Sequence, residues 1–158
     1  MIIENNSVLS GTVPATGSVT GQTARPVDGT PVVSTNTIDL SVIRDMGEGE
    51  DLYVVFTVVA AYNSLTSLQM EVIGATNDTL TTGIVPIGST GAVPLASLTA
   101  NATFYVRINP QNASKGTQYI GARYSTVGTT PTTGSVCAYI TKDIQDGRKY
   151  YPSGFAVI

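Results

Sequence analysis

Short runs in which apolar and polar side chains alternate recur along most of this chain. In "ATFYVRIN" every second residue is apolar, so one side of an extended strand would carry Ala102, Phe104, Val106 and Ile108. The run "SLQMEVIG" repeats this alternation, with Leu68, Met70 and Val72 on its apolar side. Such runs are typical of half-buried strands, and no stretch keeps a helical period over three turns.

The spacing of these runs predicts an all-β protein. Turn residues separate the β-branched and aromatic runs, which places strands near residues 35–40, 52–60, 68–74, 81–87, 103–108, 118–127 and 135–142. A further extended segment is expected at one or both ends. This count favours an antiparallel, jelly-roll-like β-sandwich.

One predicted strand is apolar on both faces. In "DLYVVFTVVAAY" one face carries Leu52, Val54, Phe56 and Val58, and the other carries Tyr53, Val55 and Val59. Apolar surface left in water forfeits about 25 cal/mol per Å², so both faces require cover. Either a loop or the N-terminal segment covers the second face, or a neighbouring subunit does. The second alternative makes Tyr53 and Val55 candidate interface residues.

The first 34 residues differ from the rest of the chain. They are rich in glycine and proline and poor in charge, so any strand ladders here are expected to be short. We therefore divide the chain into an extended N-terminal segment, 1–34, and a jelly-roll-like β domain with a C-terminal tail, 35–158. The segment is either an extended arm or an irregular edge of the sandwich.

The composition of the chain argues against several classes of function. Charged residues make up 12% of the 158 residues, against a usual share of about 25%, which indicates an unusually neutral surface. The net charge of −3 argues against nucleic acid as a partner, because phosphate binding requires a basic surface. The start of the chain lacks an export signal, and no apolar run is long enough to span a bilayer. We expect a protein that is made without export and binds no membrane.

The chain contains no histidine, which removes the usual catalytic pairs and imidazole-ligated zinc. Catalysis by two carboxylates remains open, but the sequence shows no such pair facing each other. The single cysteine, Cys137, stands among apolar neighbours and is expected to be a buried thiol without a redox role. We therefore expect no enzyme, cofactor or metal.

Two small motifs have ordinary interpretations. The acidic cluster in "RDMGEGEDLY", which ends at Asp51, could supply oxygen ligands to calcium, but it lacks the alternation of an EF-hand loop and is better explained as a solvated turn. The sequence "GSTG", residues 88–91, lacks the context of a phosphate loop or a nucleophile elbow and is expected to be a turn.

The C-terminal segment "KDIQDGRKYYPSGFAVI", residues 142–158, is unusually charged for this chain and ends in aromatic and apolar residues. Asp and Gly predict a turn after the last strand, and Pro152 prevents a regular continuation. The aromatic side chains would bury too much area to be left in water, so we expect the tail to pack on its own sandwich or on a neighbouring subunit. The candidate contact residues are Arg148, Tyr150, Tyr151 and Phe155.

Residues 36–58 and 142–158 together resemble the two ends of the tailed-phage capsid cement proteins of the Bbp16 type. Members of that family carry an Ile-Asp-Leu, Arg-Asp, Gly-x-Gly-Glu, Leu-Tyr-Val-Val run and close on Gln-Asp, Arg, Tyr and Ser-Gly. The matching positions are Ile38, Asp39, Leu40, Arg44, Asp45, Gly47, Gly49, Glu50, Leu52, Tyr53, Gln145, Asp146, Arg148, Tyr150, Ser153 and Gly154. The resemblance runs from Asn36 onward, and the stretch before Ser34 is longer than in such proteins.

The resemblance implies a jelly-roll-like protein without catalytic activity. Such a protein is made in the bacterial host cytoplasm, joins the outer surface of an icosahedral phage head as a homo-oligomer and bridges the major capsid protein. We also expect charge pairs between the two motif ends, among Arg44, Asp45, Glu50, Asp146 and Arg148. The alternative function is a jelly-roll carbohydrate- or host-binding module, although the chain has no Trp to stack on sugars.

Overall fold

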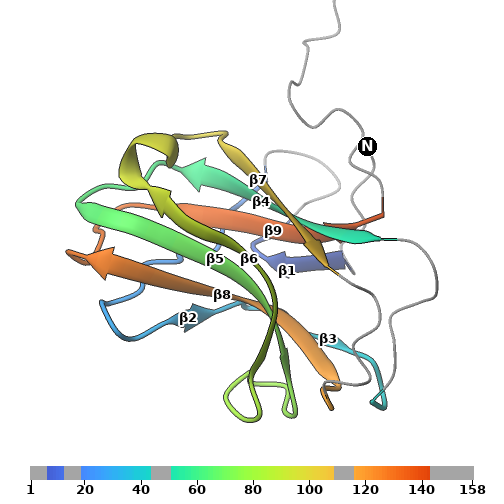
Figure 1. The fold of residues 1–158 in the computed structure, drawn as a ribbon. Coiled ribbons are helices and arrows are strands. Elements are labelled where there is room, and N and C mark those ends of the chain that lie inside the picture. Colours follow the sequence, from blue (N-terminus) through green and yellow to red (C-terminus); the bar gives the residue numbers. More distant parts are fainter. Residues whose placement is uncertain (1–6, 13–18, 44–50, 109–115, 143–158) are drawn as a thin grey trace, which may run out of the picture.

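The computed structural model describes residues 7–12, 19–43, 51–108 and 116–142. These residues are almost entirely β-structure (Figure 1). The strands are β1 (Val8–Ser10), β2 (Val32–Val33), β3 (Ile38–Asp39), β4 (Leu52–Ala60), β5 (Leu65–Ala75), β6 (Val85–Pro94), β7 (Thr103–Ile108), β8 (Tyr119–Gly128) and β9 (Ser135–Thr141). A 3₁₀ turn, η2 (Leu95–Ser97), follows β6.

The strands form two antiparallel sheets with the topology of a jelly roll. One sheet has the order β1-β9-β4-β7, and the other has the order β2-β8-β5-β6, with β3 also pairing with β8. Early strands therefore pair with late ones in nested fashion: β1 with β9, β2 and β3 with β8, β4 with β7, and β5 with β6. This nesting is that of a long hairpin rolled into a sandwich. The prediction of an all-β, jelly-roll-like sandwich is confirmed.

The core lies between the two sheets and follows the predicted alternation. Phe56 of β4 and Tyr124 of β8 are fully buried and meet edge to face, with ring centroids 6.1 Å apart. Leu68, Met70 and Val72 face the same core from β5, as the sequence pattern predicted. The hydroxyl of Tyr124 donates to Ser10 Oγ at 2.7 Å, so its polar end is satisfied inside the core.

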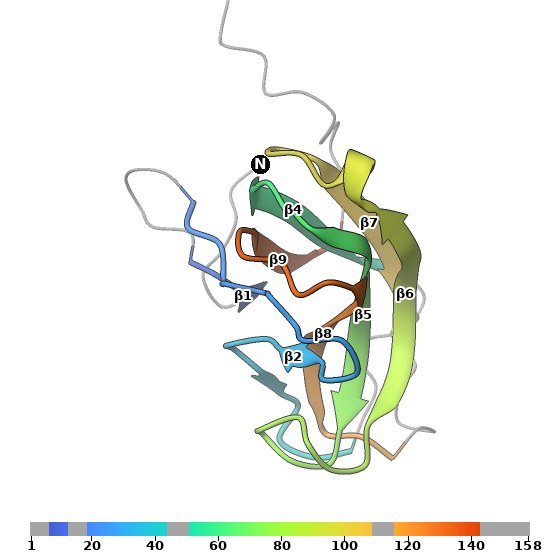
Figure 2. The ribbon, with the colours of Figure 1, turned by 90° about the vertical axis from the view of Figure 1, so that its left-hand side faces the viewer.

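The two sheets meet along both sides of the sandwich, with β6 and β7 on one side and β1 and β2 on the other (Figure 2). On one side β6 runs beside β7, and a Cβ added to Gly88 would come within 2.6 Å of Val106 Cγ1. On the other side Asn36 links β1 to the strands β2 and β3, because its backbone N–H donates to Leu9 O at 3.0 Å. Its side-chain amide donates to Val8 O at 3.1 Å.

The described parts of the N-terminal segment lie along this sandwich. They supply β1 and β2, and both strands are short, as the glycine and proline content predicted. The carbonyl of Ala24 accepts a hydrogen bond from the buried Tyr62 hydroxyl at 2.7 Å, and Gln22 pairs with Val136 at the edge of β9. Residues 7–12 and 19–34 are thus tied to both sheets by backbone contacts.

Two sequence-based predictions about the β5–β6 region were wrong. The strand expected at 81–87 begins only at Val85, because Asn77 Oδ1 accepts the backbone N–H groups of Thr81 and Thr82 at 3.0 and 2.9 Å. This Asx-type cap holds residues 77–82 in a loop. The "GSTG" sequence lies inside β6, where it forms no chain reversal.

The glycines of "GSTG" serve the strand for two physical reasons. Gly88 lacks the Cβ that would collide with β7, and Gly91 has φ of +68° at an irregularity in the β5–β6 register. The hydroxyl of Thr90 accepts the Met70 backbone N–H at 3.2 Å, so a side chain completes the ladder there. Glycine inside a strand is typical of bulges and close backbone approach.

Candidate functional site

The outer face of the β1-β9-β4-β7 sheet carries a second apolar cluster. Val8, Val55, Cys137 and Tyr139 form it, and Val55 is only 2% exposed in the single chain. Val19 of the N-terminal segment packs against this cluster, together with Val59 and Tyr105. Part of the second apolar face of β4 is thus covered by the chain itself, and Val55 offers almost no surface to a neighbour.

Cys137 lies in this outer cluster. Its side chain is a buried thiol without a disulfide, 1% exposed, as the sequence predicted. Burial raises the pKa of the thiol to about 11. The thiolate required for nucleophilic attack or metal binding is therefore disfavoured at neutral pH.

Tyr53 remains partly exposed on the same face. It pairs across the sheet with Arg107 of β7, whose guanidinium lies 2.6 Å from Asp51 Oδ2. This hydrogen bond and the charge of Asp51 raise the pKa of Arg107. Asp51, the last member of the acidic cluster, thus belongs to an exposed ion pair beside Tyr53.

The other predicted contact residues lie outside the described part of the chain. They are Arg148, Tyr150, Tyr151 and Phe155. The five residues expected to form charge pairs, Arg44, Asp45, Glu50, Asp146 and Arg148, also lie outside it. Their arrangement stays a prediction.

The outer face of the β2-β8-β5-β6 sheet is divided into three zones, of which the first is apolar. At one end the loop between β5 and β6 folds back, so that Leu80 is buried with Ile73 and Ala75. Gly121 of β8 makes room for this loop, since a Cβ there would collide with the Leu80 side chain. Thr37 Oγ1 donates to Asp78 O at 2.9 Å and ties the loop to the segment beside β3.

The middle zone is a polar network across three strands. Arg123 of β8 directs Nε and Nη2 to Glu71 Oε2 of β5, at 2.8 and 2.7 Å. Glu71 Oε1 accepts from Gln69 Nε2 at 2.9 Å, and the same amide contacts Ser89 Oγ of β6 at 3.1 Å. The Glu71 side chain is only 11% exposed, so this pair is shielded far more than the Asp51–Arg107 pair.

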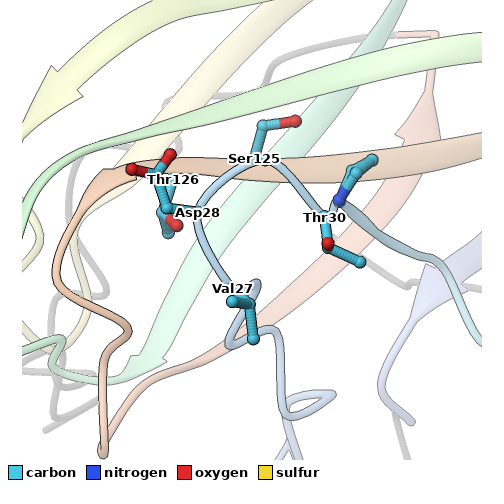
Figure 3. A pocket seen from close by; sticks show the side chains of 7 residues that line it. Val27, Asp28, Thr30, Ser125 and Thr126 are labelled. Atoms are coloured by element: carbon cyan, nitrogen blue, oxygen red, sulfur yellow. The ribbon is translucent and has the colours of Figure 1, made fainter.

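The third zone lies at the far end of β8 and contains a hollow of about 220 Å³ (Figure 3). The "VDGTP" turn and the strand end beside it form its walls, with Val27, Asp28, Gly29, Thr30, Pro31, Ser125 and Thr126 as lining residues. Sequence reasoning missed this feature. The signal was present in the Asp-Gly pair, which favours a tight turn and is flanked here by Pro26 and Pro31.

The described residues contain neither a cluster suited to a metal ion nor a helix suited to a membrane. No group of three or more His, Cys, Asp or Glu is arranged to hold a metal ion in the part of the chain that the structure describes. Within the same residues, no helix is long and apolar enough to cross a membrane.

The nested strand pairing and the closed sides define a jelly-roll β-sandwich protein. The Bbp16 family model matches residues 22–140, so the chain belongs to the Bbp16 family, and this membership indicates a phage-type protein. The match includes the 27–31 turn and ends before the C-terminal motif at 142–158. It thus starts further upstream than the resemblance at Asn36. No curated protein matches the chain.

Proposed function

We propose that this chain is a structural protein of a phage virion that binds the outer surface of an icosahedral head and cements the major capsid subunits. The observation that carries the proposal is the Bbp16 family match over residues 22–140, on a chain whose residues 36–58 and 142–158 resemble the two ends of phage cement proteins. The proposal includes no catalysis, cofactor, nucleic acid or membrane.

The chemistry of the described surface supports an adhesive role. Hydroxyl side chains and few charges cover the sandwich, and its two described ion pairs bind neighbouring strands to each other. A neutral and rigid surface loses little conformational entropy on docking. Many weakly held copies, each attached to more than one subunit, reinforce a head through effective concentration.

Co-sedimentation with phage heads tests the proposal. Purified protein is mixed with expanded heads that lack their cement protein, and bound protein is quantified after centrifugation. We expect saturation at a fixed number of copies per head, and no binding to heads that already carry their cement protein. Binding to glycans on an array without binding to heads would favour the carbohydrate- or host-binding alternative, and turnover abolished by one Asp or Glu substitution would favour an enzyme.

The homo-oligomer is a separate part of the proposal. Light scattering at tens of micromolar is expected to give a multiple of the 16.4 kDa chain mass. Deletion of residues 150–158 then separates the two roles that the sequence leaves open for the tail. A truncated chain that stays folded but no longer associates has lost an intersubunit clamp, whereas one with a much lower Tm has lost part of its own core.

A further inference from the structure

The hollow beside the 27–31 turn has an apolar and exposed rim. Val27 is 55% exposed, and Val127, which follows the lining residue Thr126 in β8, is 59% exposed. Large apolar side chains with more than half their area in water are few among the described residues, and the others are Val42 and Ile43. Val27 lines the hollow itself, and Val127 shares a face of β8 with the lining residue Ser125, because side chains two residues apart in a strand point the same way. Exposed apolar side chains are typical of a contact surface.

The turn that presents Val27 is held by two hydrogen bonds, one to β8 and one within the turn. Pro26 is buried, and its carbonyl accepts a hydrogen bond from Thr126 Oγ1 at 3.0 Å. The turn itself is closed by the Thr30 N–H, which donates to Val27 O at 2.8 Å, and Gly29 adopts φ of +77° at its tip. A preorganised loop loses less entropy on binding than a mobile one.

The chemistry of the lining indicates what fits there. Asp28 is exposed and, within the described part of the chain, forms no ion pair. Thr30 of the turn and Ser125 of β8 supply hydroxyls to the lining, and Val27 and Pro31 supply apolar surface (Figure 3). A Lys or Arg side chain matches this combination, because its aliphatic stem packs on apolar groups while its cation reaches the carboxylate.

We infer that this hollow, with Val27, Asp28 and Val127, is a docking site for a surface segment of the capsid protein that presents a basic side chain next to an apolar one. The inference rests on the proposed function and names the contact face. A second copy of this chain is a poorer occupant, because the chain carries a net charge of −3 and like charges oppose docking at Asp28.

Head binding by matched variants tests the inference. The test variant is Val27→Ser with Asp28→Asn, and its control is Val42→Ser with Asp78→Asn, which removes one exposed valine and one exposed aspartate elsewhere. We expect the test variant to raise the Kd for heads at least about tenfold, as is typical when an interface anchor is removed. The control is expected to bind like the wild type, and both should keep the wild-type Tm.

A charge reversal, Asp28→Lys, gives an independent measurement. It should weaken head binding further than Asp28→Asn, because it places a cation against the basic side chain. Wild-type affinity should also fall with added salt, and that salt dependence should shrink in Asp28→Asn. Equal binding by the test variant and the wild type would overturn the inference while leaving the proposed function intact. Failure of the wild type to bind heads would overturn both.

Discussion

The two outer faces of this sandwich differ in how their apolar side chains are covered. On the β1-β9-β4-β7 sheet Val19, Val59 and Tyr105 of the same chain pack against the apolar cluster that contains Val55. On the β2-β8-β5-β6 sheet only the Leu80 end is covered, the centre holds the Glu71–Arg123 pair, and the Val27 end remains open. Apolar residues on an outer face therefore indicate an intermolecular surface only where no segment of the chain covers them.

The exposed fraction of an outward-facing apolar residue distinguishes a residue that stabilises the fold from one that is available to a partner. Val55 and Val127 are both outward-facing valines, the first in the middle of β4 and the second near the end of β8. Their exposed fractions are nevertheless 2% and 59%. Burial of Val55 already stabilises the folded chain, whereas Val127 can still be buried by a partner. Substitutions on the two faces should thus affect different measurements.

The largest effect is expected for Leu80→Ala. Leu80 is 1% exposed and anchors the β5–β6 loop on the outer face, so its truncation should lower the free energy of unfolding by about 3 kcal/mol. Denaturant unfolding measures this, with Val42→Ala as the exposed control, for which the change should stay within about 0.5 kcal/mol. Equal losses in both variants would show that the loop is not held by Leu80.

Val55→Ala should lower the free energy of unfolding less than Leu80→Ala does, because it removes fewer buried atoms. We expect a loss of about 2 kcal/mol in the free energy of unfolding, whereas Val127→Ala should change it by less than about 0.5 kcal/mol. The association state by light scattering should be the same in both variants. A Val55→Ala protein with wild-type stability and weakened association would instead place Val55 in a subunit interface.

Substitution in the Glu71–Arg123 pair should lower the free energy of unfolding less than substitution in the two apolar clusters. Glu71→Gln leaves the shielded Arg123 guanidinium without its carboxylate and is expected to lower the free energy of unfolding by about 1 to 2 kcal/mol. Asp51→Asn breaks the exposed pair with Arg107 and should have a smaller effect, since solvent and salt screen that pair. A result in which Asp51→Asn is the more damaging of the two would contradict this ranking of the pairs.

The fold could be predicted because alternation in the central strands is strong and local. The pattern of Leu68, Met70 and Val72 indicates the inward face of β5, and the bounds predicted for β4 and β7 agree with the structure. The expected burial of Cys137 followed from its apolar neighbours in the same way. Side-chain periodicity carries this information without any knowledge of the partner strand.

The remaining features depend on residues far apart in sequence. No residue near Gly88 in the sequence indicates that β7 passes beside it. The "GSTG" sequence was therefore predicted to be a turn, although it lies in a strand. The covering of Val55 by Val19 and the hollow between Val27 and Thr126 likewise require the final sheet topology. The Asp28–Gly29 pair favours a tight turn, but it does not reveal which strand lies behind that turn.

The smallest effect near neutral pH is expected for Cys137→Ala, and it should grow with alkalinity. Burial raises the pKa of Cys137 from 9.0 to about 11, so between these values the unfolded thiol has lost a proton that the native state retains. The stabilising contribution is therefore fully present below about pH 9 and is lost as pH rises towards 11. Burial also raises the pKa of Tyr62 and Tyr124, but both side chains are present in the wild type and the variant, so these burial effects cancel in the difference. The charge of Cys137 adds a smaller upward contribution to the pKa of Tyr124, which the variant lacks. Denaturant unfolding at steps of pH should show the wild type losing stability faster than Cys137→Ala across this window. Parallel curves for the two proteins would mean that the thiol is as accessible to water in the native state as in the unfolded chain, and that the outer cluster is open.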